Sequence, residues 1–366
     1  MATAVLETPE VVSMEREKLA VIDTDIHNTV AKPQEIWSKY LSKQWYEYFK
    51  MNGLRGRQGQ NYPRGTPYAA RTDAYTSSGG RPGSDLGFMR EQLLDAYDME
   101  YGVLNCLVPV GNQSNLQFGA ALASAVNDWQ IAEWLEPEPR LRASLIVQYE
   151  DPDLAVAEIE RLGDHPGYVQ VLFLTRTMEP MGRRKYWKMY EAILKHNLNL
   201  SVHFGGDSIG PVTGAGKVSH YIEDHAGMAQ AFQAQVTSLV YEGVFEHFPE
   251  LKVSLVEGGF SWMAPLMWRL DSSYKKLKAQ APSLTRLPSE YIREHFWISS
   301  QPMEEPPERE YFHQMLEHMD MDDKIMFATD YPHWDFDSPD QALPSSLDLD
   351  LRRNIMAENA RAFYGF

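Results

Sequence analysis

The chain has 366 residues, and its 34 Lys and Arg against 51 Asp and Glu give a formal net charge of −17. A surface of that sign repels nucleic acids and anionic membranes, so we expect neither as a partner. The one cysteine, Cys106, excludes an intramolecular disulfide and any zinc site built from several thiolates, and in its apolar run it is expected to be a buried, inert thiol.

The N-terminal segment, residues 1–18, has no apolar core after a basic start and therefore does not resemble a signal peptide. No run of about 20 apolar residues occurs in the chain, so the sequence predicts no transmembrane helix. We expect a soluble, cytoplasmic protein.

The first predicted strand, residues 19–27, contains Asp25 and His27 at its end. Residues i and i+2 of a strand point to the same face, so both side chains would project into one cavity. A carboxylate and an imidazole held by one rigid strand are typical metal ligands. The alternative is an aspartate that caps a turn beside a surface histidine.

A long segment from about Pro33 to Phe88 follows this strand. It begins with an aromatic-rich, predicted helical part around Trp37 and Trp45, and then becomes rich in Gly, Arg, Pro and Ser. Such an insertion would lie at the mouth of a barrel as a lid or a subunit contact, or it is a surface excursion without function.

The rest of the chain alternates short apolar runs of strand type with longer amphipathic runs of helix type. This alternation predicts a single α/β domain over residues 1–366, a (β/α)8 TIM barrel, with an open doubly wound sheet as the alternative. No Gly-rich phosphate loop follows the first strand, which argues against the open sheet. The predicted strands are 19–27, 101–109, 142–149, 168–174, 198–203, 251–257, 295–299 and 324–329. The predicted helices are 89–99, 115–136, 152–163, 184–197, 219–248, 262–279, 304–320 and 349–364.

Polar residues also fall at the ends of three later strands: His203 at the fifth, Glu257 at the sixth and Asp330 at the eighth. The carboxyl ends of barrel strands are where catalytic residues lie in this architecture. Carboxylates together with imidazoles suit zinc, manganese or iron. We therefore expect a divalent metal site there, with one ion or two.

Two motifs are the most specific part of a resemblance that runs from Val21 to Phe366: Phe248-Pro-Glu-Leu-Lys-Val253 leading into Glu257-Gly-Gly, and Phe327-Ala-Thr-Asp-Tyr-Pro-His333. Through them the chain resembles the amidohydrolase superfamily, in the branch of aminocarboxymuconate-semialdehyde decarboxylase and the hydroxybenzoate decarboxylases. The resemblance implies a barrel whose metal ligands are Asp25, His27, His203 and Asp330. It also implies that Asp330 helps to deprotonate a metal-bound water.

The chain departs from that pattern at two positions. Asp25 stands where the resembled enzymes carry His or Glu, which keeps an oxygen donor but shortens its reach. Glu257 stands where the resembled decarboxylases carry an acid–base histidine on the sixth strand. Glu257 together with His225 is therefore a candidate ligand pair for a second metal, as in relatives of this fold that are dinuclear iron or iron–manganese oxygenases.

Three further residues are candidates from their positions. His225, at the start of the long segment after the fifth strand, is a second-metal ligand, an acid–base group or a helix cap. His333, three residues after Asp330, is expected to contact the site or to hold a ligand in place. Arg176, which follows the fourth strand, is expected to bind a substrate carboxylate or to form a surface ion pair.

The leading interpretation is a metal-dependent enzyme that hydrolyses or decarboxylates a small organic acid or amide. Asp330 or Glu257 would handle the proton, with His225 or His333 assisting. One alternative is a dinuclear non-heme iron or iron–manganese oxygenase with the same residues. Another is a weakly active or non-catalytic partner subunit with a structural metal. We expect the substrate to be a small molecule that carries a carboxylate. We also expect the protein to form a homo- or hetero-oligomer.

Overall fold

The computed structural model describes residues 18–54, 63–77, 79–206 and 212–366. The segment in which the sequence shows no signal peptide (1–17) and part of the predicted insertion (55–62 and 78) lie outside the described residues. Within the described residues, no helix is long and apolar enough to cross a membrane.

All strands of the central sheet run parallel and pair in chain order, from β1 to β8. The strands are almost entirely buried because helices cover their outer face and side chains fill the interior. Each strand lies within its predicted range or within one residue of it. The strands are β1 (Ile22–Ile26), β2 (Tyr101–Leu104), β3 (Leu141–Ile146), β4 (Tyr168–Leu174), β5 (Asn199–His203), β6 (Val253–Val256), β7 (Phe296–Ser299) and β8 (Ile325–Met326).

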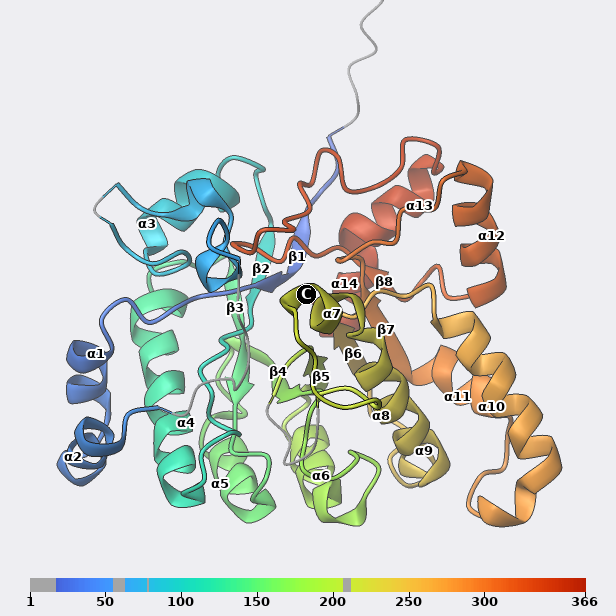
Figure 1. The fold of residues 1–366 in the computed structure, drawn as a ribbon, viewed down its shortest axis with the longest axis horizontal. Helices are drawn as coiled ribbons and strands as arrows, with labels where there is room; N and C mark the ends of the chain where they lie inside the picture. The colour runs from blue at the N-terminus through green and yellow to red at the C-terminus, as the bar shows by residue number, and fades with distance from the viewer. Residues whose placement is uncertain (1–17, 55–62, 78, 207–211) are drawn as a thin grey trace, which may run out of the picture.

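Hydrogen bonds between β1 and the segment after β8 close the sheet into a ring. The amide of Thr24 donates to the carbonyl of Phe327 at 3.0 Å. The amide of His27 donates to the carbonyl of Tyr331 at 2.7 Å. The expected (β/α)8 barrel is thus confirmed, and an open doubly wound sheet is excluded. Figure 1 shows the strands at the centre with helices around them.

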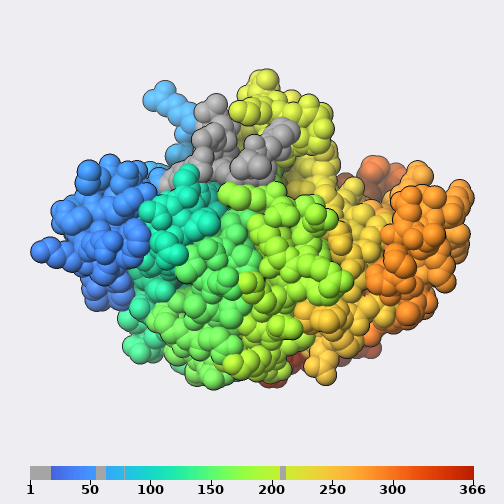
Figure 2. All heavy atoms as spheres, turned by 90° about the horizontal axis from the view of Figure 1, so that it is seen from below, coloured from blue at the N-terminus to red at the C-terminus, as the bar shows by residue number. Residues whose placement is uncertain are grey.

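The helices surround the barrel in chain order. They are α1 (Pro33–Tyr40), α2 (Lys43–Asn52), α3 (Leu86–Met89), α4 (Leu116–Gln130), α5 (Pro152–Leu162), α6 (Trp187–Lys195), α7 (Tyr221–Ala226), α8 (Ala229–Tyr241), α9 (Val244–His247), α10 (Met263–Leu277), α11 (Pro288–His295), α12 (Arg309–Met319), α13 (Leu349–Arg353) and α14 (Asn359–Tyr364). Short 3-10 segments are η1 (Pro67–Ala69), η2 (Thr72–Ala74), η5 (Arg184–Tyr186) and η6 (Lys278–Gln280), and π segments are η3 (Arg90–Leu94), η4 (Ile131–Leu135) and η7 (Asn354–Glu358). In Figure 2, α1 and α2 lie at one end of the molecule and α10 at the other.

Two helical regions differ from the prediction. Residues 219–248 are not one helix but three, α7 to α9, because the chain breaks at Gly227 and at Gly243, whose φ is +76°. The additional helix α11 lies between the predicted helix 262–279 and β7. Pro288 at its first turn and the Glu290 carboxylate, which accepts from the amide of Leu287 at 2.7 Å, start this helix.

The C-terminal segment seals the barrel at the end where the strands begin. Asn199, the first residue of β5, donates from its amide side chain to the carbonyl of Phe363 at 3.1 Å. The Phe363 ring packs on Trp297 with ring centroids 5.0 Å apart, in a small apolar cluster with Ile22 and Met326. The opposite end of the barrel, where the strands finish, is therefore the end open to a ligand.

Candidate metal centre

Asp25 in β1 and His27, which directly follows β1, lie on one side of the barrel mouth, as the strand period predicts. Both side chains are buried, and Oδ1 of Asp25 lies 3.4 Å from Nε2 of His27. The Nδ1–H of His27 donates to the backbone carbonyl of Asn105 at 2.7 Å, so Nε2 is the ring atom that faces the centre.

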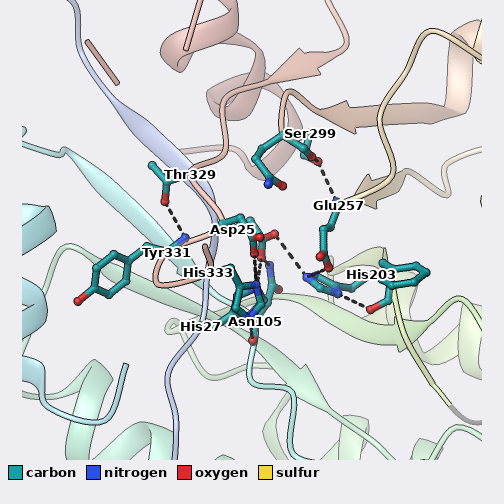
Figure 3. Close-up of polar contacts among 12 residues, drawn as sticks. Asp25, His27, Asn105, His203, Glu257, Ser299, Thr329, Tyr331 and His333 are labelled. Carbon is teal, nitrogen blue, oxygen red and sulfur yellow. Dashed lines mark hydrogen bonds and ion pairs between the residues drawn. The ribbon is translucent and has the colours of Figure 1, made fainter. Parts of the chain in front are cut away.

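His203 ends β5 and points at the same space, as Figure 3 shows. Its Nε2 atom lies 3.4 Å from Oδ2 of Asp25. The Nδ1–H donates to the backbone carbonyl of Phe204 at 2.8 Å, which fixes the ring with Nε2 inward.

Asp330 comes from the loop after β8 and has a left-handed backbone, with φ +59°. This conformation is costly for a non-glycine residue and occurs preferentially at functional sites. It is held by the Asp330 amide, which donates to the carbonyl of Asp25 at 3.1 Å. Oδ1 of Asp330 then accepts from Nε2 of His27 at 2.8 Å and from Nδ1 of His333 at 2.7 Å.

Three buried polar atoms at the centre have no hydrogen-bond partner among the described residues: Oδ2 of Asp25, Nε2 of His203 and Oδ2 of Asp330. Buried polar atoms are almost always paired, so these three indicate a missing partner. Ligand atoms of Asp25, His27, His203 and Asp330 all lie within 4.8 Å of one another. Two imidazoles and two carboxylates suit a divalent ion such as zinc, manganese or iron, so the residues present fit a metal.

Without a metal, charge at the centre is balanced by protons. Burial by itself lowers the pKa of His27, but the carboxylates of Asp25 and Asp330 raise it to about 9. Burial raises the pKa of Asp330, but His333 and His27 outweigh that effect and hold it well below its usual range. A bound cation would take the place of the His27 proton.

A second group of ligand atoms shares Asp330 and adds Glu257 and His333, again within 4.8 Å of one another. Glu257 follows β6 with φ +61°, and its amide donates to Oγ of Ser299 at 3.0 Å. Its Oε2 atom lies 3.5 Å from Nε2 of His203. Glu257 and His333 thus border the four-residue centre on the cavity side.

His225 lies on the cavity wall but contacts a different residue. Its Nε2 is 3.0 Å from Oδ2 of Asp335, which also accepts from the Gln301 amide at 3.0 Å. His225 belongs to neither group of clustered ligand atoms within the described residues. The sequence suggested His225 as the partner of Glu257, but the histidine that lies beside Glu257 is His333.

Arg176 is buried against Asp224 and does not line the cavity at the metal centre. Its guanidinium pairs with the Asp224 carboxylate and lies 4.7 Å from the centre of the Phe204 ring. The expected role in substrate binding therefore has no support from its position, because its charge already has a buried partner.

The cavity above the centre has a volume of about 350 Å³, within the range of small-molecule sites. His27, Glu257 and His333 form part of its wall. Residues from the predicted insertion form another part, including Trp37, Leu54, Tyr68 and Arg81. Arg81 is the one Lys or Arg on this wall among the described residues, and its guanidinium lies 5.2 Å from the centre of the Tyr68 ring.

Sequence reasoning did not select Asn105, Asp335 or Arg81. Asn105 directly follows β2, so the strand-end rule that selects His203 could also have selected it. Asp335 and Arg81 lie in loops, where no periodicity indicates the direction of a side chain.

Comparison with known proteins gives three kinds of match. The family profile described as Amidohydrolase matches residues 22–366. Gamma-resorcylate decarboxylase of Polaromonas sp. (strain JS666) is 24% identical over 302 residues, which are 74% of this chain and 87% of that protein.

Solved structures share the barrel. An amidohydrolase from Mycobacterium avium subsp. paratuberculosis K-10 matches with a TM-score of 0.71 and 20% identity over 95% of this chain and 99% of that chain. 5-carboxyvanillate decarboxylase LigW from Sphingomonas paucimobilis matches with a TM-score of 0.69, 19% identity and coverage of 95% and 99%. Dihydroxybenzoic acid decarboxylase from Polaromonas sp. JS666, with bound manganese and 2-nitroresorcinol, matches with a TM-score of 0.64, 18% identity and coverage of 95% and 97%.

Proposed function

The chain belongs to the amidohydrolase family. On that premise we propose that it is a metal-dependent decarboxylase of a small aromatic carboxylic acid. The observation that carries the proposal is the set of unpartnered buried atoms of Asp25, His203 and Asp330 beneath a small-molecule cavity. The names of gamma-resorcylate decarboxylase and 5-carboxyvanillate decarboxylase support the reaction class, and the manganese bound to one relative supports the cation.

The cavity wall supports a flat, apolar substrate body with an anionic group. Leu54, Leu107 and Phe204 supply apolar surface, and Arg81 supplies a cation at an exposed position. A guanidinium beside an aromatic ring suits a carboxylate or a phenolate oxygen. We assign to Arg81 the anion-binding role that the sequence suggested for Arg176.

Asp25, His27, His203 and Asp330 would hold the cation, which supplies a Lewis acid that polarises an oxygen of the substrate. Glu257, in its acid form, donates a proton to the ring carbon that bears the carboxylate. The bond between that carbon and the carboxylate then breaks, its electron pair restores the aromatic ring, carbon dioxide leaves, and Glu257 is reprotonated from water. Asp335 holds His225 at the cavity wall, where the imidazole can exchange that proton.

The test is turnover of hydroxybenzoic acids by the manganese-loaded protein in D₂O. Decarboxylation releases one carbon dioxide for each product and places one deuterium on the carbon that carried the carboxylate. A panel of aryl amides is assayed in parallel. Release of amine without carbon dioxide would replace this proposal by metal-assisted hydrolysis, the other reaction that the residues can support. Turnover by the purified chain alone would exclude a non-catalytic partner subunit.

A second candidate function is oxygen activation at a dinuclear centre. The observation that favours it is the second group of ligand atoms, from Glu257, Asp330 and His333, with Asp330 common to both groups. Elemental analysis separates the two candidates, since decarboxylation needs one cation per chain and this centre needs two. Product formation that stops without dioxygen would support the second candidate and overturn the first.

A further inference from the structure

A row of buried polar side chains fills the interior of the barrel between the candidate metal centre and the C-terminal helix. Polar groups are costly in a barrel core unless they are hydrogen-bonded. Asn105, Ser144, Gln170 and Ser254 are all fully buried, and each makes hydrogen bonds to another member of the row.

The row begins at Tyr364, in the helix α14 that seals the barrel. The Tyr364 hydroxyl donates to Oε1 of Gln170 at 3.0 Å, and Oγ of Ser254 donates to the same atom at 3.3 Å. Two donors on Oε1 fix which way the Gln170 amide faces. Its Nε2 therefore points onward and donates to Oγ of Ser144 at 2.9 Å and to Oδ1 of Asn105 at 3.3 Å.

The row ends on the metal centre. Oγ of Ser144 donates to Oδ1 of Asn105 at 2.5 Å. Because Oδ1 accepts this hydrogen bond, the orientation of the Asn105 side-chain amide is also fixed. Its Nδ2 donates to Oδ1 of Asp25 at 2.8 Å and to the carbonyl of Thr24 at 3.1 Å. The backbone carbonyl of Asn105 accepts from Nδ1 of His27, so one residue contacts both Asp25 and His27, as Figure 3 shows.

The hydrogen bonds from Tyr364 through Gln170, Ser144 and Asn105 all run in the same direction, from the sealed end toward the Asp25 carboxylate. Hydrogen bonds aligned in this way polarise one another. The last acceptor is the Asp25 carboxylate, and a hydrogen bond to an anion is stronger than one to a neutral group. The bond from Asn105 also occupies Oδ1 of Asp25 and leaves Oδ2 as the unpartnered oxygen that faces His203.

We propose that Asn105 is a positioning residue that selects the coordinating oxygen of Asp25 and the coordinating nitrogen of His27. We further propose that the chain of hydrogen bonds to Tyr364 makes cation affinity depend on the helix at the sealed end. The inference rests on the proposed cation site but not on the reaction, so it applies equally to decarboxylation and to oxygen activation.

The test is manganese binding to the metal-free full-length protein, measured by calorimetry and by the electron paramagnetic resonance of free Mn²⁺. Asn105→Ala is expected to weaken binding about 10- to 100-fold, the usual effect of removing a group that holds a metal ligand. Tyr364→Phe removes one hydroxyl at the far end and is expected to weaken binding less, by about two- to fivefold, because it acts through intervening amides.

Ser201→Ala is the matched control. Ser201 lies in β5 and is equally buried, but its hydroxyl has no hydrogen-bond partner among the described residues. Its removal should leave manganese affinity at the wild-type value. If Ser201→Ala weakens binding as much as Tyr364→Phe, the effect comes from general loosening of the core, and the proposal is overturned.

Circular dichroism and thermal unfolding show whether each variant is folded. Tyr364→Phe keeps the ring, so it carries the test if Asn105→Ala does not fold. Variants that lose thermal stability but bind manganese as tightly as wild type would show a purely structural role and overturn the positioning proposal alone. Wild-type protein that binds no manganese, zinc or iron would overturn the cation site and this inference together.

Discussion

Oε2 of Glu257 lies 3.5 Å from Nε2 of His203, on the side of the candidate metal centre that faces the cavity. A carboxyl group here is close enough to the clustered ligands to bind a cation, and it also reaches the space that a substrate would occupy. The variant Glu257→Gln separates these two roles.

We expect Glu257→Gln to lower decarboxylation by about 10²- to 10⁴-fold, the usual contribution of a general acid or base. The amount of bound cation should stay at the wild-type value, because the four proposed ligands remain. Elemental analysis and turnover are measured on the same sample. The matched control is Glu305→Gln, at an exposed position that does not line the cavity at the metal centre. A loss of cation in Glu257→Gln would identify Glu257 as a ligand.

Asp330→Asn should abolish turnover and weaken manganese binding by more than about 100-fold. This exceeds the usual effect of removing a residue that only hydrogen-bonds to a metal ligand. Asparagine tolerates a positive φ, so the backbone at +59° is preserved while the charge is removed. Circular dichroism should show the wild-type content of helix and strand. Normal turnover in this variant would contradict the assigned role of Asp330.

Manganese affinity should rise with pH up to about 9, because the raised pKa of His27 means that binding must displace its proton. In the metal-free protein the folded-state pKa is above the ordinary value of 6.5. The protonated histidine therefore contributes stability that is fully present below pH 6.5 and lost as the pH rises toward 9. Calorimetric titration in buffers of different ionisation enthalpy counts the protons released. Binding without proton release at pH 7.5 would refute this prediction.

Gly83→Ala should destabilise the protein more than Gly79→Ala does, by about 1–3 kcal/mol. Both glycines have a positive φ, +71° and +78°, so both variants share the backbone cost. A Cβ at Gly83 would lie 2.3 Å from the carbonyl oxygen of His27, whereas a Cβ at Gly79 meets nothing within 4 Å. Thermal unfolding measures the difference in stability between the two variants. Manganese affinity should fall only in Gly83→Ala. Equal effects of the two variants would refute the role of this contact.

Arg81→Gln should raise the KM for a hydroxybenzoate about tenfold or more, because a charge-assisted hydrogen bond to the substrate anion is lost. The kcat should change less, since Arg81 is assigned no proton transfer. Arg64→Gln, at an exposed position in the same insertion and away from the cavity wall, is the control. An unchanged KM in Arg81→Gln would remove Arg81 from the substrate site.

The barrel and the positions of the candidate ligands at its strand ends could be predicted from the sequence. The two-residue period of a strand puts Asp25 and His27 on one side, and parallel strands bring their ends to one rim, where His203 also lies. Asn105 obeys the same rule. Because the regular backbone of a strand fixes the direction of each side chain, a position in the sequence is enough to place it.

The positions of Arg176, Arg81, His225 and His333, by contrast, were decided only by the tertiary structure. Arg176 and Arg81 carry the same charge, yet Arg176 is buried against Asp224 and Arg81 lies on the cavity wall. His225 pairs with Asp335, 110 positions later, and His333 takes the place beside Glu257. Loops lack a repeating backbone, so packing against distant parts of the chain sets the direction of their side chains, and no local pattern records that packing.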